Sequence, residues 1–123
     1  MRALVVDDSE AMRGMLAMIL RKFGFEVFDA EDAERGMTLL RAKYPVDLAL
    51  VDWRMPGIDG IAFIRQVRAS GLYKNLKILM TTAVNEVGNA GNARAAGADE
   101  FLLKPLTTSA VRDKLRALGF VPN

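Results

Sequence analysis

The chain has 123 residues, which suits one ordinary domain and is too short for a catalytic domain beside a separate binding domain. Hydrophobic residues make up 51% of the sequence and charged residues 26%, a globular composition rather than a disordered one. The sequence has no cysteine and no histidine, which excludes disulfides, thiolate or imidazole zinc sites and histidine-dependent triads. Acid–base or metal chemistry must therefore use carboxylates, lysine, tyrosine, hydroxyls or the backbone.

The formal net charge of +2 is small, and the lysines and arginines are scattered along the chain. Because DNA-binding domains cluster their basic residues, we expect no direct nucleic-acid binding. No apolar run approaches the roughly 20 residues of a membrane helix. The N-terminal apolar run stops at Asp7 and Asp8 and does not form a signal peptide. We therefore expect a cytoplasmic protein that does not enter a membrane.

The first half of the chain alternates short apolar runs with segments of helical period. Ala3–Val6 is a strand candidate that ends at Asp7 and Asp8. Ser9 can cap a helix that runs to about Phe23, because its hydroxyl can accept from a free N–H of the first turn. A second strand and a second helix, capped by an aspartate, follow over 26–30 and 32–43.

The second half continues the alternation. Leu48–Val51, within the strand expected at 47–52, is apolar on both faces, which is typical of a parallel sheet covered by helices. A helix at 86–96 is expected to be weak, because Gly88 and Gly91 each cost about 1 kcal/mol relative to alanine. The other expected elements are a helix at 60–69, a strand at 77–82, a strand at 101–103 and a helix at 108–118.

Five strands in strict alternation with five helices predict one α/β domain over residues 1–123. Right-handed crossovers would place the helices on both faces of a doubly wound parallel sheet. Such sheets bind ligands at the carboxyl ends of their strands.

Polar residues gather at those strand ends. Asp7 and Asp8 follow the first strand, Asp52 ends the third, Thr82 ends the fourth and Lys104 follows the fifth. Taken alone, each has an ordinary explanation as a turn former, a helix cap or a surface residue. Their joint occurrence at one sheet edge, in order, favours a functional site.

Three carboxylates at one edge repel one another, so they must either raise a pKa or bind a cation. An all-oxygen site suits a hard ion, Mg²⁺ or Mn²⁺. A lysine and a threonine hydroxyl beside that ion could hold two further oxygens of a phosphoryl group. The set indicates acyl-phosphate chemistry, in which a carboxylate accepts a phosphoryl group and water later removes it.

The pattern resembles response-regulator receiver domains of two-component systems, above all CheY-like single-domain response regulators. The resemblance runs from Ala3 to Leu118. It implies a flavodoxin-like (βα)5 fold with a five-stranded parallel sheet of order 2-1-3-4-5. The motifs that carry it are Asp7-Asp8, Asp52 with Met55-Pro56-Gly57 and Asp59-Gly60, Thr82-Ala83, and Lys104-Pro105.

The resemblance implies a role for each acidic residue. Asp52 would be the phosphoacceptor. Asp8 would bind Mg²⁺ directly and Asp7 partly through water, with the backbone carbonyl of Arg54 as a further ligand. Because a receiver catalyses only its own phosphorylation and dephosphorylation, we expect no enzyme in the usual sense.

The same resemblance implies roles for residues of the last two strands. Thr82 would hydrogen-bond a phosphoryl oxygen and move on activation, and Lys104 would pair with the phosphoryl group. Pro105 would follow through a cis peptide bond. Phe101 stands where the family places an aromatic switch residue, often tyrosine, and keeps its bulk without the hydroxyl.

The implied partners are a sensor histidine kinase or phosphotransfer protein as phosphodonor and a downstream protein target. The conformational signal would appear on the face built from the fourth helix, fifth strand and fifth helix. A chemotaxis-type role fits, and the protein could be a monomer or a phosphorylation-dependent homodimer. Arg54 and Val84 stand at positions that tune the family's dephosphorylation rate.

Three other functions would use part of the same pattern. A haloacid-dehalogenase-like phosphatase would share the aspartate nucleophile. Such enzymes need a second aspartate as acid–base two residues later, where this chain has Arg54. An unphosphorylated interaction module of the same fold would not need all five polar residues. A flavodoxin-like cofactor binder would need a phosphate cradle after the first strand, where Asp7 and Asp8 would repel phosphate.

Overall fold

The computed structural model describes residues 1–83 and 90–121. Its five strands form one parallel sheet of order β2-β1-β3-β4-β5, so the fold class and strand order are confirmed. The strands are β1 (Arg2–Val6), β2 (Glu26–Ala30), β3 (Leu48–Asp52), β4 (Lys77–Ala83) and β5 (Glu100–Lys104).

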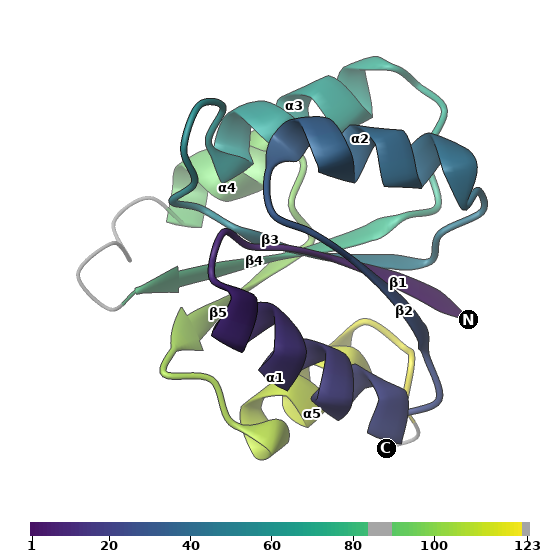
Figure 1. The fold of residues 1–123 in the computed structure, drawn as a ribbon, viewed down its shortest axis with the longest axis vertical. Coiled ribbons are helices and arrows are strands. Elements are labelled where there is room, and N and C mark those ends of the chain that lie inside the picture. The colour runs from purple at the N-terminus through teal and green to yellow at the C-terminus, as the bar shows by residue number, and fades with distance from the viewer. Residues whose placement is uncertain (84–89, 122–123) are drawn as a thin grey trace.

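Helices cover both faces of this sheet (Figure 1). On one face lie α1 (Glu10–Lys22) and α5 (Thr108–Ala117), and on the other lie α2 (Ala33–Ala42), α3 (Gly60–Ala69) and α4 (Ala90–Ala96). Among the described residues, no helix combines the length and apolarity needed to span a membrane.

Side chains cap four helices where the chain leaves a strand, and one of them is α5, where the Thr107 hydroxyl accepts from the backbone N–H of Ala110 at 3.1 Å. The Ser9 hydroxyl accepts from the backbone N–H of Met12 at 3.2 Å, as expected for the start of α1. The Asp32 and Asp59 carboxylates accept equivalent bonds at the starts of α2 and α3, at 2.8 and 2.9 Å. Each cap fixes the point at which a βα loop ends, and these loops carry the polar residues of the sheet edge.

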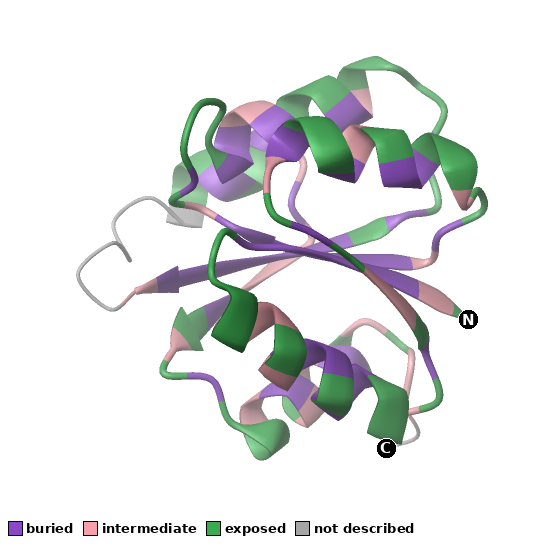
Figure 2. Cartoon of the chain, viewed as in Figure 1, coloured by how far each residue is buried: buried purple, intermediate pink, exposed green. Residues whose placement is uncertain are grey.

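Strand alternation divides the core into two apolar clusters. Leu50, Leu79 and Leu102 pack with residues of α1 and α5 on one face. Val51 and Met80 pack with residues of α2, α3 and α4 on the other. Every residue of β3 is buried, as expected for a central parallel strand, and Figure 2 shows the buried residues concentrated along the sheet and the inner helix surfaces.

Element boundaries differ from the expected ones by one or two residues. β4 runs one residue past Thr82, and β5 includes Glu100 and Lys104 on either side of the expected strand. The structure describes the weak helix only from Ala90 to Ala96, so its expected beginning, with Gly88, lies outside the described residues. Ladder hydrogen bonds with the neighbouring strand, which the apolar pattern does not reveal, account for the longer strands.

Candidate functional site

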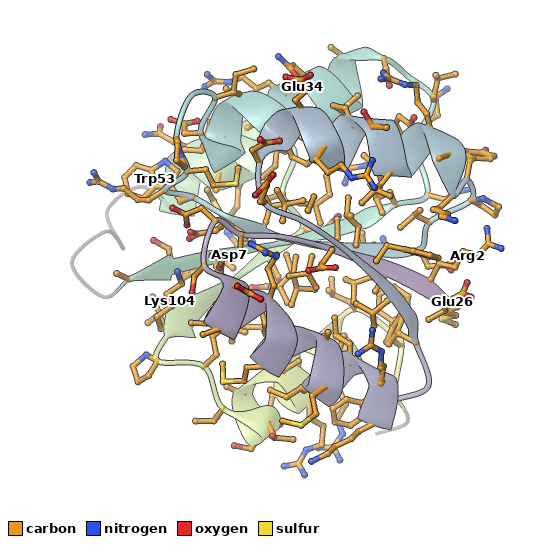
Figure 3. The ribbon with its side chains drawn as sticks, viewed as in Figure 1. Arg2, Asp7, Glu26, Glu34, Trp53 and Lys104 are labelled. Carbon is orange, nitrogen blue, oxygen red and sulfur yellow. The ribbon has the colours of Figure 1, made fainter. Side chains whose placement is uncertain are left out.

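The site lies where the strands end in parallel register. Asp7 follows the last residue of β1, Asp52 is the last residue of β3 and Lys104 is the last residue of β5. Figure 3 shows Asp7, Trp53 and Lys104 at one end of the sheet, with Arg2 and Glu26 at the other. Parallel pairing therefore brings together residues nearly one hundred positions apart in the sequence.

The three expected carboxylates form one cluster. One oxygen each from Asp7, Asp8 and Asp52 lies within 4.8 Å of the others. Asp7 is 1% exposed and Asp52 is 5% exposed, while Asp8 faces solvent. The backbone N–H of Ser9 donates to Asp7 Oδ1 at 2.8 Å, which fixes the orientation of that carboxylate.

Lys104 provides the positive charge of the cluster. Its Nζ donates to Asp52 Oδ1 at 3.0 Å and lies 3.9 Å from Asp7 Oδ2. One ammonium against three carboxylates leaves two excess negative charges when all are ionised. Such a pocket attracts a divalent cation.

Burial raises the pKa of both inner carboxylates. It is the largest influence on the pKa of Asp7, opposed by the Ser9 hydrogen bond and the charge of Lys104. It is also the largest influence on the pKa of Asp52, opposed by the Lys104 hydrogen bond and reinforced by the charge of Asp7. The charged forms of both groups are therefore costly until a cation balances them.

The donor set fits Mg²⁺ or Mn²⁺. Carboxylate oxygens are the ligands these hard ions prefer, and a site with one or two protein carboxylates leaves room for water and phosphate oxygens. Asp7 Oδ2 is buried and has no hydrogen-bond partner within residues 1–83 and 90–121. A buried carboxylate oxygen that accepts no hydrogen bond and lies beside two further carboxylates is consistent with a cation ligand.

Thr82 directly follows Thr81, the register partner of Asp52, but its hydroxyl is not hydrogen-bonded to the cluster. Thr82 is 4% exposed, and its Oγ1 has no hydrogen-bond partner in the described part of the chain. It follows Met80 by two residues, so strand alternation places it on the face opposite Leu79. The structure thus leaves the Thr82 hydroxyl available, without showing the expected contact with a phosphoryl group.

Phe101 lies beside two cations at the edge of the sheet. The Arg94 guanidinium lies 5.5 Å and the Lys114 ammonium 5.6 Å from the centre of its ring. Both cations also reach Glu100, at 3.4 and 2.9 Å, and the Lys114 hydrogen bond is the main cause of the lowered pKa of that carboxylate. These contacts join α4, β5 and α5 around a half-buried aromatic ring, and the Lys104–Pro105 peptide bond that follows β5 is cis.

The loop after β3 forms the outer wall of the site. The guanidinium of Arg54 lies 5.0 Å from the centre of the Trp53 ring, and both residues line an open cavity of about 500 Å³ together with Asp8. The Arg54 side chain is therefore beside the carboxylate cluster, on the solvent side. Val84, the other expected tuning position, lies outside the described residues.

One contact of the site was not anticipated. Arg13, on α1, donates from NH1 to the backbone carbonyl of Asp7 at 2.8 Å and from Nε to Asp29 at 2.9 Å. Its guanidinium thereby ties the loop that carries Asp7 to α1 and β2. No sequence motif marks this role, because the spacing from Asp7 to Arg13 acquires meaning only once the strand and helix pack.

Comparison with known proteins identifies the family. A model of the response regulator receiver domain matches residues 3–116. The chain belongs to this family. It is 34% identical over 117 residues to the chemotaxis protein CheY-3 of Vibrio cholerae, covering 94% of this chain and 88% of that protein. The crystallised chemotaxis protein CheY4 of Vibrio cholerae superposes with a TM-score of 0.84 at 31% identity, covering 94% of this chain and 96% of that chain.

Other receivers belong to longer proteins. The phosphate regulon transcriptional regulatory protein PhoB of Escherichia coli is 31% identical over 117 residues, which are 95% of this chain and 51% of PhoB. This chain thus spans about half the length of the PhoB proteins it matches. As a receiver domain it is a phosphoacceptor switch of the two-component type, and receivers act as signalling switches rather than as enzymes with a separate substrate.

Proposed function

We propose that Asp52 is the phosphoacceptor of this receiver. The observation that carries the proposal is the hydrogen bond of 3.0 Å from Lys104 Nζ to Asp52 Oδ1 at the end of β3, inside the carboxylate cluster. Of the three carboxylates, Asp52 is the one that accepts a hydrogen bond from Lys104, which can later pair with a phosphoryl group, whereas Asp7 lies 3.9 Å from that lysine. Asp7 and Asp8 stand beside it as cation ligands.

We infer that Asp7, Asp8, Asp52 and the backbone carbonyl of Arg54 would hold Mg²⁺, or Mn²⁺ in its place. The bound ion would neutralise the charge that the donor phosphoryl group brings to an already anionic site. Ser9 and Arg13 orient the Asp7 loop through the bonds to its carboxylate and carbonyl.

In the transfer step, an oxygen of Asp52 attacks phosphorus while the bond from phosphorus to an imidazole nitrogen of the donor breaks. The electron pair of that bond leaves with the nitrogen, and Lys104 remains to balance the new charge. The donor is a phosphohistidine of a sensor histidine kinase or phosphotransfer protein, which supplies the histidine that this chain lacks. Receivers as a class take phosphate from such kinases.

The readout is a change at α4, β5 and α5. The acyl phosphate adds about one negative charge to the site, which draws the Thr82 hydroxyl and Lys104 towards it. Phe101, held by cation–π contacts instead of a tyrosine hydrogen bond, changes its position when those neighbours move. A downstream protein, or a second copy of the receiver, then binds the altered face. A chemotaxis-type role is consistent with the resemblance to the chemotaxis protein CheY-3, and we also propose a cytoplasmic location.

The test is phosphorylation by acetyl phosphate with Mg²⁺, followed by intact-protein mass spectrometry. We expect the unchanged chain to gain one phosphoryl group and Asp52→Asn to gain none. Asp113→Asn, which changes an exposed carboxylate on α5, is the matched control and should be modified like the unchanged chain. Equal labelling of Asp52→Asn would overturn the assignment, and rapid Mg²⁺-dependent turnover of a phosphomonoester would favour the phosphatase alternative.

A further inference from the structure

The bond between Lys104 and Asp52 passes over an intervening strand. Lys104 belongs to β5 and Asp52 to β3, and β4 lies between them in the sheet. Asp52 pairs in register with Thr81, and Lys104 pairs with Ala83. The lysine side chain therefore spans β4 at the level of these two residues.

Thr81 lies on the same face of the sheet as this ion pair. Side chains alternate along a strand, and Thr81 comes two residues after Leu79. Asp52 and Lys104 likewise come two residues after Leu50 and Leu102, and those three leucines pack in one cluster against α1 and α5. The threonine thus lies under the bond between Lys104 and Asp52, which accounts for its exposure of only 1%.

The hydroxyl of Thr81 is buried without a partner. Its Oγ1 forms no hydrogen bond with any residue in the ranges 1–83 and 90–121. Leaving a buried hydroxyl unpaired destabilises the folded state, whereas a valine of the same shape would fill the position without that cost. An unpaired hydroxyl at the floor of a charged site therefore calls for a functional explanation.

We propose that the Thr81 hydroxyl is a further part of the phosphorylation site, donating to the Asp52 carboxyl oxygen that Lys104 releases when it turns to the phosphoryl group. Neighbouring parallel strands are about 4.8 Å apart, so rotation about the Cα–Cβ bond of Thr81 brings its hydroxyl towards its register partner. This inference rests on the proposed function of Asp52.

The hydrogen bond from the Thr81 hydroxyl affects the rate at which the phosphoryl group is lost. Water attacks phosphorus, the bond from phosphorus to Asp52 breaks, and its electron pair stays with Asp52 as a carboxylate. The protons of the water remain with the released phosphate and the solvent. Because the returning negative charge spreads over both carboxylate oxygens, a hydroxyl donating to one of them stabilises the transition state. Removing that donor slows dephosphorylation.

The experiment compares Thr81→Val, Thr81→Ser and Thr38→Val with the unchanged chain. Each protein is phosphorylated with acetyl phosphate and Mg²⁺, the donor is removed, and the remaining phosphoprotein is followed by mass. Thr81→Val should lengthen the half-life about five-fold, as expected for one hydrogen bond of ordinary strength. Thr81→Ser, which keeps the hydroxyl, should restore most of the rate. Thr38→Val alters an exposed hydroxyl on α2 and should change nothing.

Thermal unfolding separates this role from simple packing. Thr81→Val should keep or raise Tm, because it removes an unpaired buried hydroxyl, while it slows dephosphorylation. Equal half-lives for Thr81→Val and the unchanged chain would overturn the inference and leave the role of Asp52 intact. A longer half-life in Thr81→Ser than in Thr81→Val would also overturn it, since the missing methyl group would then be the cause. Failure of the unchanged chain to accept a phosphoryl group would instead reject the proposed function.

Discussion

Replacing Asp7 by asparagine tests the electrostatics of the site most directly. Asp7 is 1% exposed, lies 3.9 Å from Lys104 Nζ and within 4.8 Å of the nearest oxygen of Asp52. At an effective dielectric constant of about 20, the attraction of Asp7 to Lys104 and its repulsion by Asp52 are each about 4 kcal/mol and nearly cancel. What remains is the cost of burying the charge, which is also the largest cause of the raised pKa of Asp7.

We therefore expect Asp7→Asn to stabilise the cation-free protein by about 2 kcal/mol, because asparagine keeps the oxygen that accepts from Ser9 and removes the buried charge. For a domain of this size that corresponds to a rise in Tm of about 8 °C. In Mg²⁺ the difference in Tm between Asp7→Asn and the unchanged chain should shrink or change sign. At a Mg²⁺ concentration one hundred times the dissociation constant, binding stabilises the unchanged chain by about 2.7 kcal/mol, and it stabilises the variant by less.

The assay is thermal unfolding followed by circular dichroism, in EDTA and across a Mg²⁺ titration. Asp113→Asn serves as the control, because its side chain is 66% exposed and its removal leaves the carboxylate cluster unchanged. A lower Tm for Asp7→Asn in EDTA would refute the reasoning, because the pairing with Lys104 would then outweigh the cost of burial. Equal Mg²⁺ stabilisation of the two proteins would refute the assignment of Asp7 as a ligand.

Three further predictions concern the same edge of the sheet. In EDTA, the extra stability of Asp7→Asn over the unchanged chain should grow as the pH rises from 3.8 through the raised pKa of Asp7. Over this range the unfolded chain ionises Asp7 freely, whereas the folded state must bury the charge. A difference in stability that does not depend on pH would contradict this. Gly60→Ala should destabilise by about 2–3 kcal/mol in urea unfolding, because a Cβ there would collide with the backbone carbonyl of Asp52, while Gly14→Ala on α1 should be neutral or stabilising. Arg13→Gln should weaken Mg²⁺ binding several-fold, because the variant loses the hydrogen bond that holds the Asp7 carbonyl. Mg²⁺ binding can be followed by Trp53 fluorescence, and an unchanged affinity would show that the Asp7 loop holds its shape without Arg13.

Much of the fold could be predicted from the sequence because the local signals were strong. The run Leu48–Val51 predicted a central strand, and β3 is buried throughout. Ser9 and Asp32 were expected to cap helices and do so, since the cap bond involves residues only three positions apart. Strand ends were less well predicted, because ladder bonds between strands decide them.

The candidate site, too, could be predicted only in part from the sequence. Asp7, Asp8 and Asp52 were predicted as a group because each follows an apolar run, and parallel pairing puts such residues at one edge. Thr81 was missed, since a hydroxyl in a strand carries no local sign of being unpaired. Its meaning depends on Lys104 reaching across β4 to Asp52.

The sequence by itself determined the alternation of five strands and helices, the caps and the identity of the acidic residues, because these depend on residues close together in the chain. The tertiary structure decided which carboxylates are buried, that Arg13 holds the Asp7 carbonyl, and that Phe101 lies beside Arg94 and Lys114. Those properties depend on distances between side chains of different elements, which exist only after the sheet and both helical layers have packed together.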